Sequence, residues 1–425
     1  MIWVYRLLFL PALLLASPYF LWRMRKRGGY ASGFSHRFGE VPDLPPKAPG
    51  AQRVWLQAVS VGEMLAIGPL LEGLRREGLE IYLTTTTSTG YALAKEKYAA
   101  LTVGLGYFPL DFWAFSARAW RRVQPDLCVL MEGERWPEHI RAAQRHGVPV
   151  VCVNARLSDR SFRRSAKFAW AVRATAGSVA KILCAAKRDE QRFRALGFPA
   201  AKLVTTGNLK LDVSIPLLAA AAKAALRREV GLPADGLVLL GSSTWPGEEE
   251  ALVEALKNAR ARGLRVSLLL VPRHAERRDA LRTLLAGSGL SHHFRSEGSA
   301  PAAADVVVGD TTGELRQLTQ LADLVFVGKS LSPHDGGQTP VEAAILGKPV
   351  LHGPAMTNFR DIVRSLTEAA AVRRVETHAD LVRVAVELLG DTARRDALAA
   401  SAREWSAANR GATERTLAEI KRVLG

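Results

Sequence analysis

The sequence is poor in cysteine. Three cysteines, Cys128, Cys152 and Cys184, occur among 425 residues, and each lies inside an apolar run with no CxxC pair and no histidine at ligand spacing. This pattern argues against a disulfide framework and against a zinc site. We interpret the three residues as reduced core cysteines of a protein whose body lies in the cytosol.

Acidic residues are also scarce relative to basic ones. Asp and Glu number 41 against 58 Lys and Arg, which gives a net charge of +17. Such an excess indicates an anionic partner, which could be nucleic acid, a phospholipid surface or a phosphorylated substrate. The arginine-rich stretches are not interleaved with aromatic residues, and aromatic residues make up only 7% of the chain. We therefore do not expect nucleic-acid binding.

The N-terminus carries a long stretch without charge. Leu7 to Trp22 is uncharged over sixteen residues, and a basic run follows at Arg23, Arg25, Lys26 and Arg27. As a helix it would reach about 24 Å, somewhat short of a hydrocarbon core of about 30 Å. The basic run follows the apolar stretch, whereas in a cleavable signal peptide it precedes it. We predict a membrane anchor with a basic flank over residues 1–27, spanning or only inserted; the alternatives are a signal peptide and a packing helix.

Beyond residue 50 short β-branched runs alternate with helical patterns, which is typical of parallel α/β sheets. In the first half we expect strands at 53–60, 80–87, 127–132, 149–154, 181–185 and 203–207. In the second half we expect them at 237–241, 265–272, 305–309, 324–328 and 349–352. The join falls near residues 212–216. We predict an acceptor domain at 28–212, a nucleotide-binding domain at 217–400 and a C-terminal helix at 401–425 that packs back on the first domain.

An internal repeat supports two similar domains. Gly62 and Gly78 flank a helical stretch that leads into a strand, and Gly247 and Gly263, also sixteen residues apart, flank another. Two Rossmann-like domains facing each other across a cleft would give this pattern, although chance similarity of two βαβ units is the alternative. In either case ligands are expected outside the carboxyl ends of the strands.

In the second half these strand ends suit an anion. The small residues Gly241 to Ser243 precede Trp245, Gly247 and Glu248, so backbone amides and a helix N-terminus could meet a phosphate. Arg273 and His274 end the next strand. Further on, Glu342 follows Gly336 and Gly337. Thr339 as N-cap and Pro340 as first helical residue would make Glu342 part of a capping box, and binding of ribose hydroxyls is the equally open alternative.

In the first half, carboxylates follow two strands. Ser60, Gly62 and Glu63 form a capping-box pattern, so Glu63 is either a helix cap or a general base at a helix N-terminus. Glu132 and Glu134 end the strand that begins near residue 127. Ion pairing is one interpretation of this pair, and acceptor or sugar binding is the other.

The order and spacing of these motifs resemble the 3-deoxy-D-manno-octulosonic acid (Kdo) transferases of lipopolysaccharide assembly, a family with the GT-B fold. The resemblance covers nearly the whole chain. It is carried by Gly29 to Glu40 with Arg37, Ser60 to Glu63, Thr84 to Gly90, Glu132 to Pro137, Asn154 to Ser158, Gly207 to Lys210, Pro272 to His274, and Gly336 to Glu342.

The resemblance implies an inverting transfer of Kdo from CMP-Kdo to the acylated, phosphorylated glucosamine disaccharide that precedes lipid A, at the cytoplasmic face of the inner membrane. It places the catalytic base at Glu63 and the acceptor and sugar pocket at Arg37, Ser60, Gly62, Glu132 and Glu134. It places donor binding at Ser242, Ser243, Gly247, Glu248, Arg273, His274, Gly336, Gly337, Glu342, Asn208 and Lys210. Without a DxD-type carboxylate cluster, we expect no metal and no cofactor.

The sequence departs from the family pattern on the donor side. Gln338 and Thr339 stand where the family commonly has His-Asn, and Trp245 stands where it often has His. Two other functions therefore stay open. One is a GT-B enzyme acting on a UDP-sugar, as a transferase or an epimerase. The other is a catalytically silent membrane-bound protein that binds nucleotide or lipid phosphate.

Overall fold

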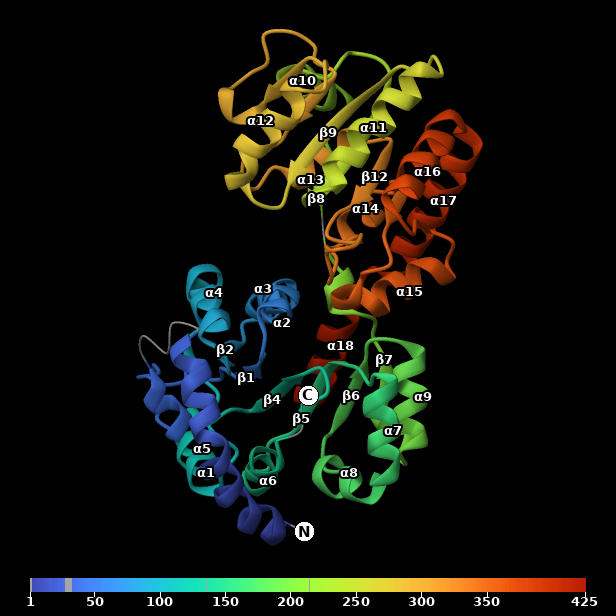
Figure 1. Ribbon diagram of the computed structural model, residues 1–425. Coiled ribbons are helices and arrows are strands. Elements are labelled where there is room, and N and C mark those ends of the chain that lie inside the picture. Colours follow the sequence, from blue (N-terminus) through green and yellow to red (C-terminus); the bar gives the residue numbers. More distant parts are fainter. Residues whose placement is uncertain (1, 27–32, 135, 214) are drawn as a thin grey trace. The chain divides into compact units, whose positions relative to one another are not determined.

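The computed structural model (Figure 1) describes residues 2–26, 33–134, 136–213 and 215–425, and the side chains of residues 8, 10, 20, 21 and 23–26 are outside this description. The chain forms two compact units. Unit 1 runs to Asp212 and includes Asn409–Gly425, and unit 2 is Val213–Ala408. The end of the chain thus belongs to the first unit.

Unit 1 is built on a parallel sheet of seven strands in the order β3-β2-β1-β4-β5-β6-β7. The strands are β1 Arg53–Gln57, β2 Glu80–Thr85, β3 Gly104–Tyr107, β4 Leu127–Met131, β5 Val150–Ala155, β6 Lys181–Cys184 and β7 Leu203–Thr205. The helices are α1 Ile2–Lys26, α2 Val61–Ala66, α3 Gly68–Arg76, α4 Ser88–Tyr98, α5 Trp113–Val123, α6 Pro137–Arg145, α7 Asp159–Lys167, α8 Ala169–Ala176, α9 Lys187–Ala195 and α18 Ala412–Leu424.

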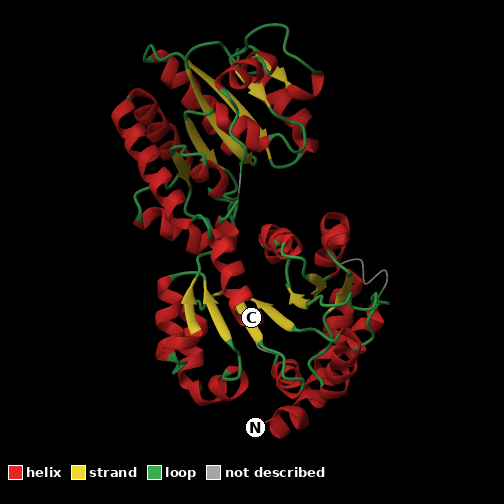
Figure 2. Ribbon diagram, turned by 180° about the vertical axis from the view of Figure 1, so that it is seen from behind, coloured by secondary structure: helices red, strands yellow, loops and turns green. Residues whose placement is uncertain are grey.

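Helices cover both faces of this sheet, which is why its central strands are continuously apolar rather than alternating. One face packs on α2, α3, α4 and α18, where Leu417 and Ile420 join the core. The other face packs on α5, α6, α8 and α9 around the buried Trp55 and Trp120. Figure 2 shows the yellow strands with red helices on either side. The C-terminal helix α18 is therefore an integral part of the unit 1 core.

The N-terminal helix α1 is docked on unit 1 through polar contacts near its start. Arg6 forms a two-pronged ion pair with the buried Glu138, with Nε to Oε1 at 2.5 Å and Nη2 to Oε2 at 2.8 Å. Tyr5 donates to Asp111 Oδ2 at 2.7 Å, and Phe9 stacks on Phe112. Among the described residues, no helix is both long and apolar enough to cross a membrane. The anchor therefore stays a prediction, and Arg27 of its basic flank lies outside the described residues.

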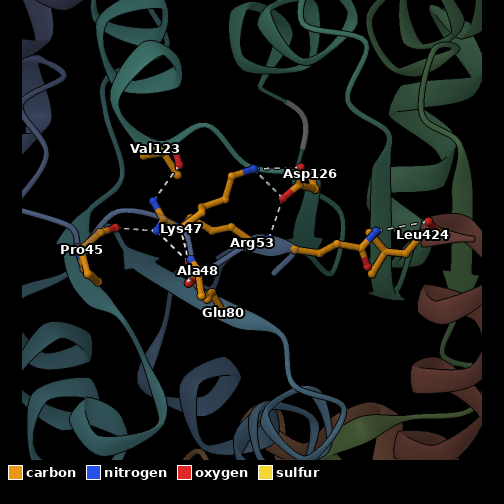
Figure 3. Close-up of polar contacts among 9 residues, drawn as sticks. Pro45, Lys47, Ala48, Arg53, Glu80, Val123, Asp126 and Leu424 are labelled. Carbon is orange, nitrogen blue, oxygen red and sulfur yellow. Dashed lines mark hydrogen bonds and ion pairs between the residues drawn. The ribbon is translucent and has the colours of Figure 1, made fainter. Parts of the chain in front are cut away.

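A buried polar network fixes the amino-terminal edge of this sheet (Figure 3). Arg53 of β1 pairs with Glu80 of β2 at 2.7 Å and donates to the carbonyls of Val123 and Pro45. Asp126 accepts from the Arg53 amide at 2.7 Å and from Lys47 at 2.9 Å. Because Arg53 and Glu80 are desolvated, each needs its partner for stability. The network ties the segment before β1 to the sheet edge opposite the candidate site.

Unit 2 has a second parallel sheet of seven strands, in the order β10-β11-β9-β8-β12-β13-β14. The strands are β8 Leu237–Thr244, β9 Val266–Pro272, β10 His292–Phe294, β11 Val306–Val308, β12 Leu324–Val327, β13 Val350–His352 and β14 Val372–Arg374. The helices are α10 Ala220–Glu229, α11 Glu248–Ala261, α12 Arg278–Ala286, α13 Leu315–Leu318, α14 Val341–Ile345, α15 Arg360–Glu368, α16 His378–Gly390 and α17 Thr392–Asn409. Its main apolar core joins α11, α12 and α16 to the sheet.

The eleven strands expected from the sequence are all present, and three strands were missed. The missed ones, β3, β10 and β14, all lie at an edge of their sheet. Each has three or four residues, and edge strands have a neighbour on one side only, so they need no long apolar run. Hydrophobic patterning therefore located the central strands and the edge strand β7, and it missed the other three edge strands.

The internal repeat has a structural counterpart. Gly78 and Gly263 adopt positive φ values of 77° and 79° after α3 and α11, and each begins the turn into the next strand, β2 and β9. Left-handed glycine is the common way to end a helix. In both sheets the strand before the helix then pairs with the strand after it.

Candidate active site

Glu63 lies just beyond the carboxyl end of β1, at the start of α2. Ser60 is the N-cap: its hydroxyl accepts from the Glu63 amide at 3.2 Å and donates to Glu63 Oε1 at 2.9 Å. The other oxygen, Oε2, accepts from the Val59 amide at 2.9 Å. Glu63 thus takes part in capping α2 and also has a carboxylate of fixed orientation. Only 8% of Glu63 is exposed, so its carboxylate is held in one position.

Two further carboxylates follow β4, the neighbour of β1. Glu132 has a positive φ of 55°, an unfavourable conformation for a residue with a side chain, and such residues cluster at functional sites. Lys210 of the short 3-10 helix η4 (Leu209–Leu211) donates to Glu132 Oε1 at 2.6 Å. Trp136 donates from its indole nitrogen to Glu134 Oε2 at 2.7 Å. Both carboxylates are therefore positioned by a neighbouring side chain.

These groups interact electrostatically. Burial raises the pKa of Glu63 above its usual value, the charge of Glu132 raises it further, and the hydrogen bonds to Val59 and Ser60 oppose the rise. Burial also raises the pKa of Glu134 to about 7, with a further contribution from the charge of Glu63. A carboxylate whose pKa approaches neutrality is suited to taking up a proton in the physiological pH range.

The other unit 1 residues that the sequence singles out have mainly structural contacts. The Asn208 side chain accepts from the Lys210 amide at 3.0 Å and so shapes η4. Arg37, in the 3-10 helix η1 (Phe34–Phe38), donates to the Phe108 carbonyl. Gly62 is the second residue of α2, where an added Cβ would meet only Ser60 Oγ, at 4.0 Å. Lys210, for which we expected a donor contact, pairs with Glu132 of unit 1, and the donor contact stays a prediction. Gly29 of the predicted motif lies outside the described residues.

In unit 2 the buried Glu248 joins two strand ends. Its carboxylate accepts from the amides of Trp245, Lys329 and Ser330, each at 2.9 Å, and from that of Leu331 at 3.3 Å. Trp245 follows β8, and the other three residues follow β12, the strand next to β8. Glu248 is fully buried, and all these bonds are to the protein backbone. Glu248 therefore holds the two loops together.

The small residues after Leu240 differ in burial and backbone conformation. Ser242 is buried within β8, and Ser243 has a positive φ of 54°. Gly247 is the N-cap of α11 with φ 90°, and its amide donates to Glu250 Oε2 at 2.7 Å. The Gly247 amide is thus engaged in capping. Ser243 remains at the bend, half-buried and in a strained conformation.

Aromatic and basic side chains surround this bend. The Trp245 ring contacts those of His274 and His334, with centroids 5.5 and 5.3 Å apart, and the Lys329 ammonium lies 4.9 Å from the Trp245 centroid. Arg273 is exposed directly after β9. The sequence had singled out Arg273 and His274 but not Lys329. The sequence could have indicated Lys329 only by its place directly after a predicted strand, and a single lysine at a strand end is common.

The loop with Gly336 and Gly337 packs against this region. Their φ values are 105° and 68°, and a Cβ on Gly336 would come within 2.6 Å of the Asn358 side chain. The capping box expected for Glu342 does not form. Thr339 Oγ1 does accept from the Val341 amide, at 3.3 Å, but the Glu342 carboxylate pairs with Arg316 at 2.7 Å because α14 begins one residue later than expected.

Both units therefore place polar side chains at the carboxyl ends of parallel strands, as nucleotide-dependent α/β proteins do. The fold is shared with a UDP-GlcNAc 2-epimerase of Neisseria meningitidis bound to UDP-GlcNAc, at a TM-score of 0.56 and 14% identity, covering 88% of this chain and 99% of that one. It is also shared with the HepE protein of Anabaena in complex with UDP, at 0.52 and 15%, with the same coverage. These similarities define the GT-B class of fold.

The family follows from sequence similarity. A sequence model of "3-Deoxy-D-manno-octulosonic-acid transferase (kdotransferase)" matches residues 32–213. A 3-deoxy-D-manno-octulosonic acid transferase of Bordetella pertussis is 36% identical over 425 residues, covering 97% of each chain. That of Haemophilus influenzae is 33% identical over 426 residues, covering 98% of this chain and 95% of its own. The chain belongs to the Kdo transferase family and is a glycosyltransferase, which confirms the resemblance.

Proposed function

We propose that this glycosyltransferase moves Kdo from CMP-Kdo to the acylated, phosphorylated glucosamine disaccharide that precedes lipid A, with inversion at the anomeric carbon. Glu63 is the general base that takes the proton from the attacking acceptor hydroxyl. Inversion requires one such base and a single displacement, in which the sugar–oxygen bond to CMP breaks as the new glycosidic bond forms.

The geometry of Glu63 carries this proposal. Its carboxylate is fixed by Ser60 and Val59 beyond the end of β1, and its pKa is raised by burial and by Glu132. A base held in place needs no reorganisation before it accepts a proton. Lys210 compensates part of the negative charge of the cluster through Glu132. The cluster thus combines a raised pKa of Glu63 with a nearby positive charge that opposes the rise.

The donor belongs to unit 2 in this proposal. The loop from Ser243 to Gly247 and the exposed Arg273 lie at the carboxyl ends of β8 and β9, where a nucleotide phosphate would be expected. Cations and dipoles at this edge would stabilise the charge that develops on departing CMP. We assign no step to a metal ion.

We also propose that unit 1 contacts the cytoplasmic face of the inner membrane. The α1 helix exposes Trp3, Leu7 and Leu15, at 73%, 75% and 84%. Unit 1 also exposes Phe168 and Trp170 where α7 meets α8. Exposed aromatic residues and a net charge of +17 suit an anionic lipid surface.

The donor and acceptor are tested together by mass spectrometry. The purified full chain is incubated with tetra-acylated lipid A precursor and either CMP-Kdo or a UDP-hexose, and the mass of the lipid is followed. A mass increase of one or more Kdo residues with CMP-Kdo alone supports the proposal. Transfer only from the UDP-sugar, or no transfer from either donor, would refute it.

A further inference from the structure

Lys329 has a constrained backbone at the carboxyl end of β12. Its φ is 57°, and Ser243, the next-to-last residue of the neighbouring strand β8, has a φ of 54°. Residues with side chains adopt this conformation only where their surroundings impose it, and such residues cluster at ligand sites. Here the Lys329 amide donates to Glu248 at 2.9 Å, and its carbonyl accepts from Gly337 at 3.0 Å. Two bonds from different loops thus fix the direction in which its side chain leaves the backbone.

The Lys329 side chain is also held at its far end. Its ammonium lies 4.9 Å from the centroid of the Trp245 ring, a cation–π contact. Trp245 in turn has its amide bound to Glu248 and its ring against His274 and His334. His334 is anchored to the Pro246 carbonyl at 2.7 Å. The positive charge of Lys329 is therefore positioned by an aromatic ring and not by a carboxylate.

In the part of the chain that the structure describes, no carboxylate pairs with Lys329 or with Arg273. Arg273 directly follows β9, and Lys329 lies two residues beyond β12, and these strands pair with β8 on its two sides. Two uncompensated cations thus flank the end of one central strand, at the edge where parallel sheets bind ligands. Most other lysines and arginines of unit 2 donate a hydrogen bond to an oxygen of the protein. Arg277, for example, donates to the Glu249 carboxylate.

We propose that Lys329 binds the phosphate of the nucleotide donor and that Trp245 is the positioning residue that holds its ammonium. The ligand class is a nucleoside monophosphate or its sugar ester. The inference rests on the proposed nucleotide-sugar donor and adds a specific phosphate ligand that the sequence motifs did not indicate. It also gives a role to Trp245, which stands where the family often has histidine. An indole presents a larger face to a cation than an imidazole does.

The test compares nucleotide with nucleoside in the full chain. Calorimetry measures the affinities for CMP, UMP, cytidine and uridine in wild type, Lys329→Met, Lys329→Arg and, as a matched control, Lys257→Met on the exposed side of α11. Charge-assisted bonds to phosphate predict that Lys329→Met weakens CMP about 10-fold or more and leaves cytidine unchanged, while Lys329→Arg retains most of the affinity. Lys257→Met should match wild type.

Trp245→Leu tests the positioning role. It should raise the KM for the donor, and should make CMP binding more sensitive to salt, while cytidine binding stays unchanged. A Lys329→Gly variant separates fold from binding, because glycine accepts the positive φ without strain. Its melting temperature should equal or exceed that of wild type while its CMP affinity falls as in Lys329→Met.

The outcomes distinguish this inference from the proposed function. An unchanged ratio of CMP to cytidine affinity in Lys329→Met would overturn the inference even if Kdo transfer is observed. A loss confined to the two monophosphates would support it even if the transferred sugar is not Kdo. Wild type that binds neither CMP nor UMP more tightly than their nucleosides would overturn it as well.

Discussion

The ammonium nitrogen of Lys210 lies 2.6 Å from Oε1 of Glu132, next to the carboxylate that we assign as the base. The positive charge of Lys210 lowers the pKa of Glu63, and the negative charge of Glu132 raises it. The ion pair therefore moderates the proton affinity of Glu63, which burial has already increased. The pH dependence of the reaction should therefore report how Lys210 and Glu132 change the pKa of Glu63.

Lys210→Met should shift the acid limb of the pH profile of kcat/KM to higher pH. Removing the positive charge leaves Glu63 under the negative charge of Glu132, so its pKa rises. The measurement is kcat/KM against pH, whose acid limb reports the base in the free enzyme. Lys97→Met, an exposed lysine of α4, serves as the control and should leave the limb in place. An unshifted limb in Lys210→Met would show that the ion pair does not act on the base.

Glu134→Gln should change stability in a pH-dependent way. A carboxyl whose pKa in the folded protein is about 7, above its unfolded value, costs stability progressively as the pH rises toward 7. Glutamine still accepts from Trp136, so the variant should unfold at a higher denaturant concentration at pH 8. Its free energy of unfolding there should exceed that of wild type by up to about 3 kcal/mol. At pH 4 it should match wild type. Equal stability at both pH values would contradict the raised pKa.

Arg6→Met should destabilise unit 1 by about 3 kcal/mol, because it leaves Glu138 buried without its partner. Glu138 is 2% exposed and receives two bonds from Arg6. The double variant Arg6→Met and Glu138→Met should recover much of this loss in urea unfolding, since no unpaired charge remains. Arg76→Met is the control, because its pair with Glu414 is exposed and contributes less than about 0.5 kcal/mol. If all three unfold like wild type, α1 does not dock as described.

Glu248→Ala should remove the acceptor of four backbone amides and destabilise unit 2 by about 3 kcal/mol or more. CMP binding should be lost with it, because the loops that carry Trp245 and Lys329 lose their common partner. Glu250→Ala, which removes only the bond to the exposed Gly247 cap, should cost about 1 kcal/mol. Thermal unfolding of the two variants tests the difference. Comparable losses would mean that Glu248 is an ordinary cap.

Much of the fold could be predicted from the sequence, since buried parallel strands have a distinctive apolar pattern. The strands at residues 127–131 and 266–272 are examples of this pattern, and both lie inside their sheets. The edge strands β3, β10 and β14 escaped because they are short and need little apolar sequence. The docking of α1 by Tyr5 and Arg6 escaped as well, because their partners Asp111 and Glu138 are more than a hundred residues away along the chain.

The candidate site could be predicted in outline. Strand ends located Glu63, Glu132 and Glu134, because position in a parallel sheet follows from the order of strands and helices. Hydrogen-bond partners did not follow in the same way. The sequence did not indicate that Glu248 accepts from four backbone amides or that Lys210 pairs with Glu132. These partnerships depend on the register between distant loops, which local pattern does not encode.

The central claim is that Glu63 is the base, and the rate of transfer by Glu63→Gln tests it most directly. Glutamine preserves the size of the side chain and can still accept from Val59, but it cannot take up a proton. Kdo transfer from CMP-Kdo to the tetra-acylated precursor is followed by mass spectrometry, with Glu72→Gln on the exposed side of α3 as the control. The account predicts a loss of at least about 100-fold in kcat for Glu63→Gln, with CMP affinity and melting temperature retained, and wild-type rates for Glu72→Gln. A Glu63→Gln enzyme that transfers Kdo at the wild-type rate would contradict it.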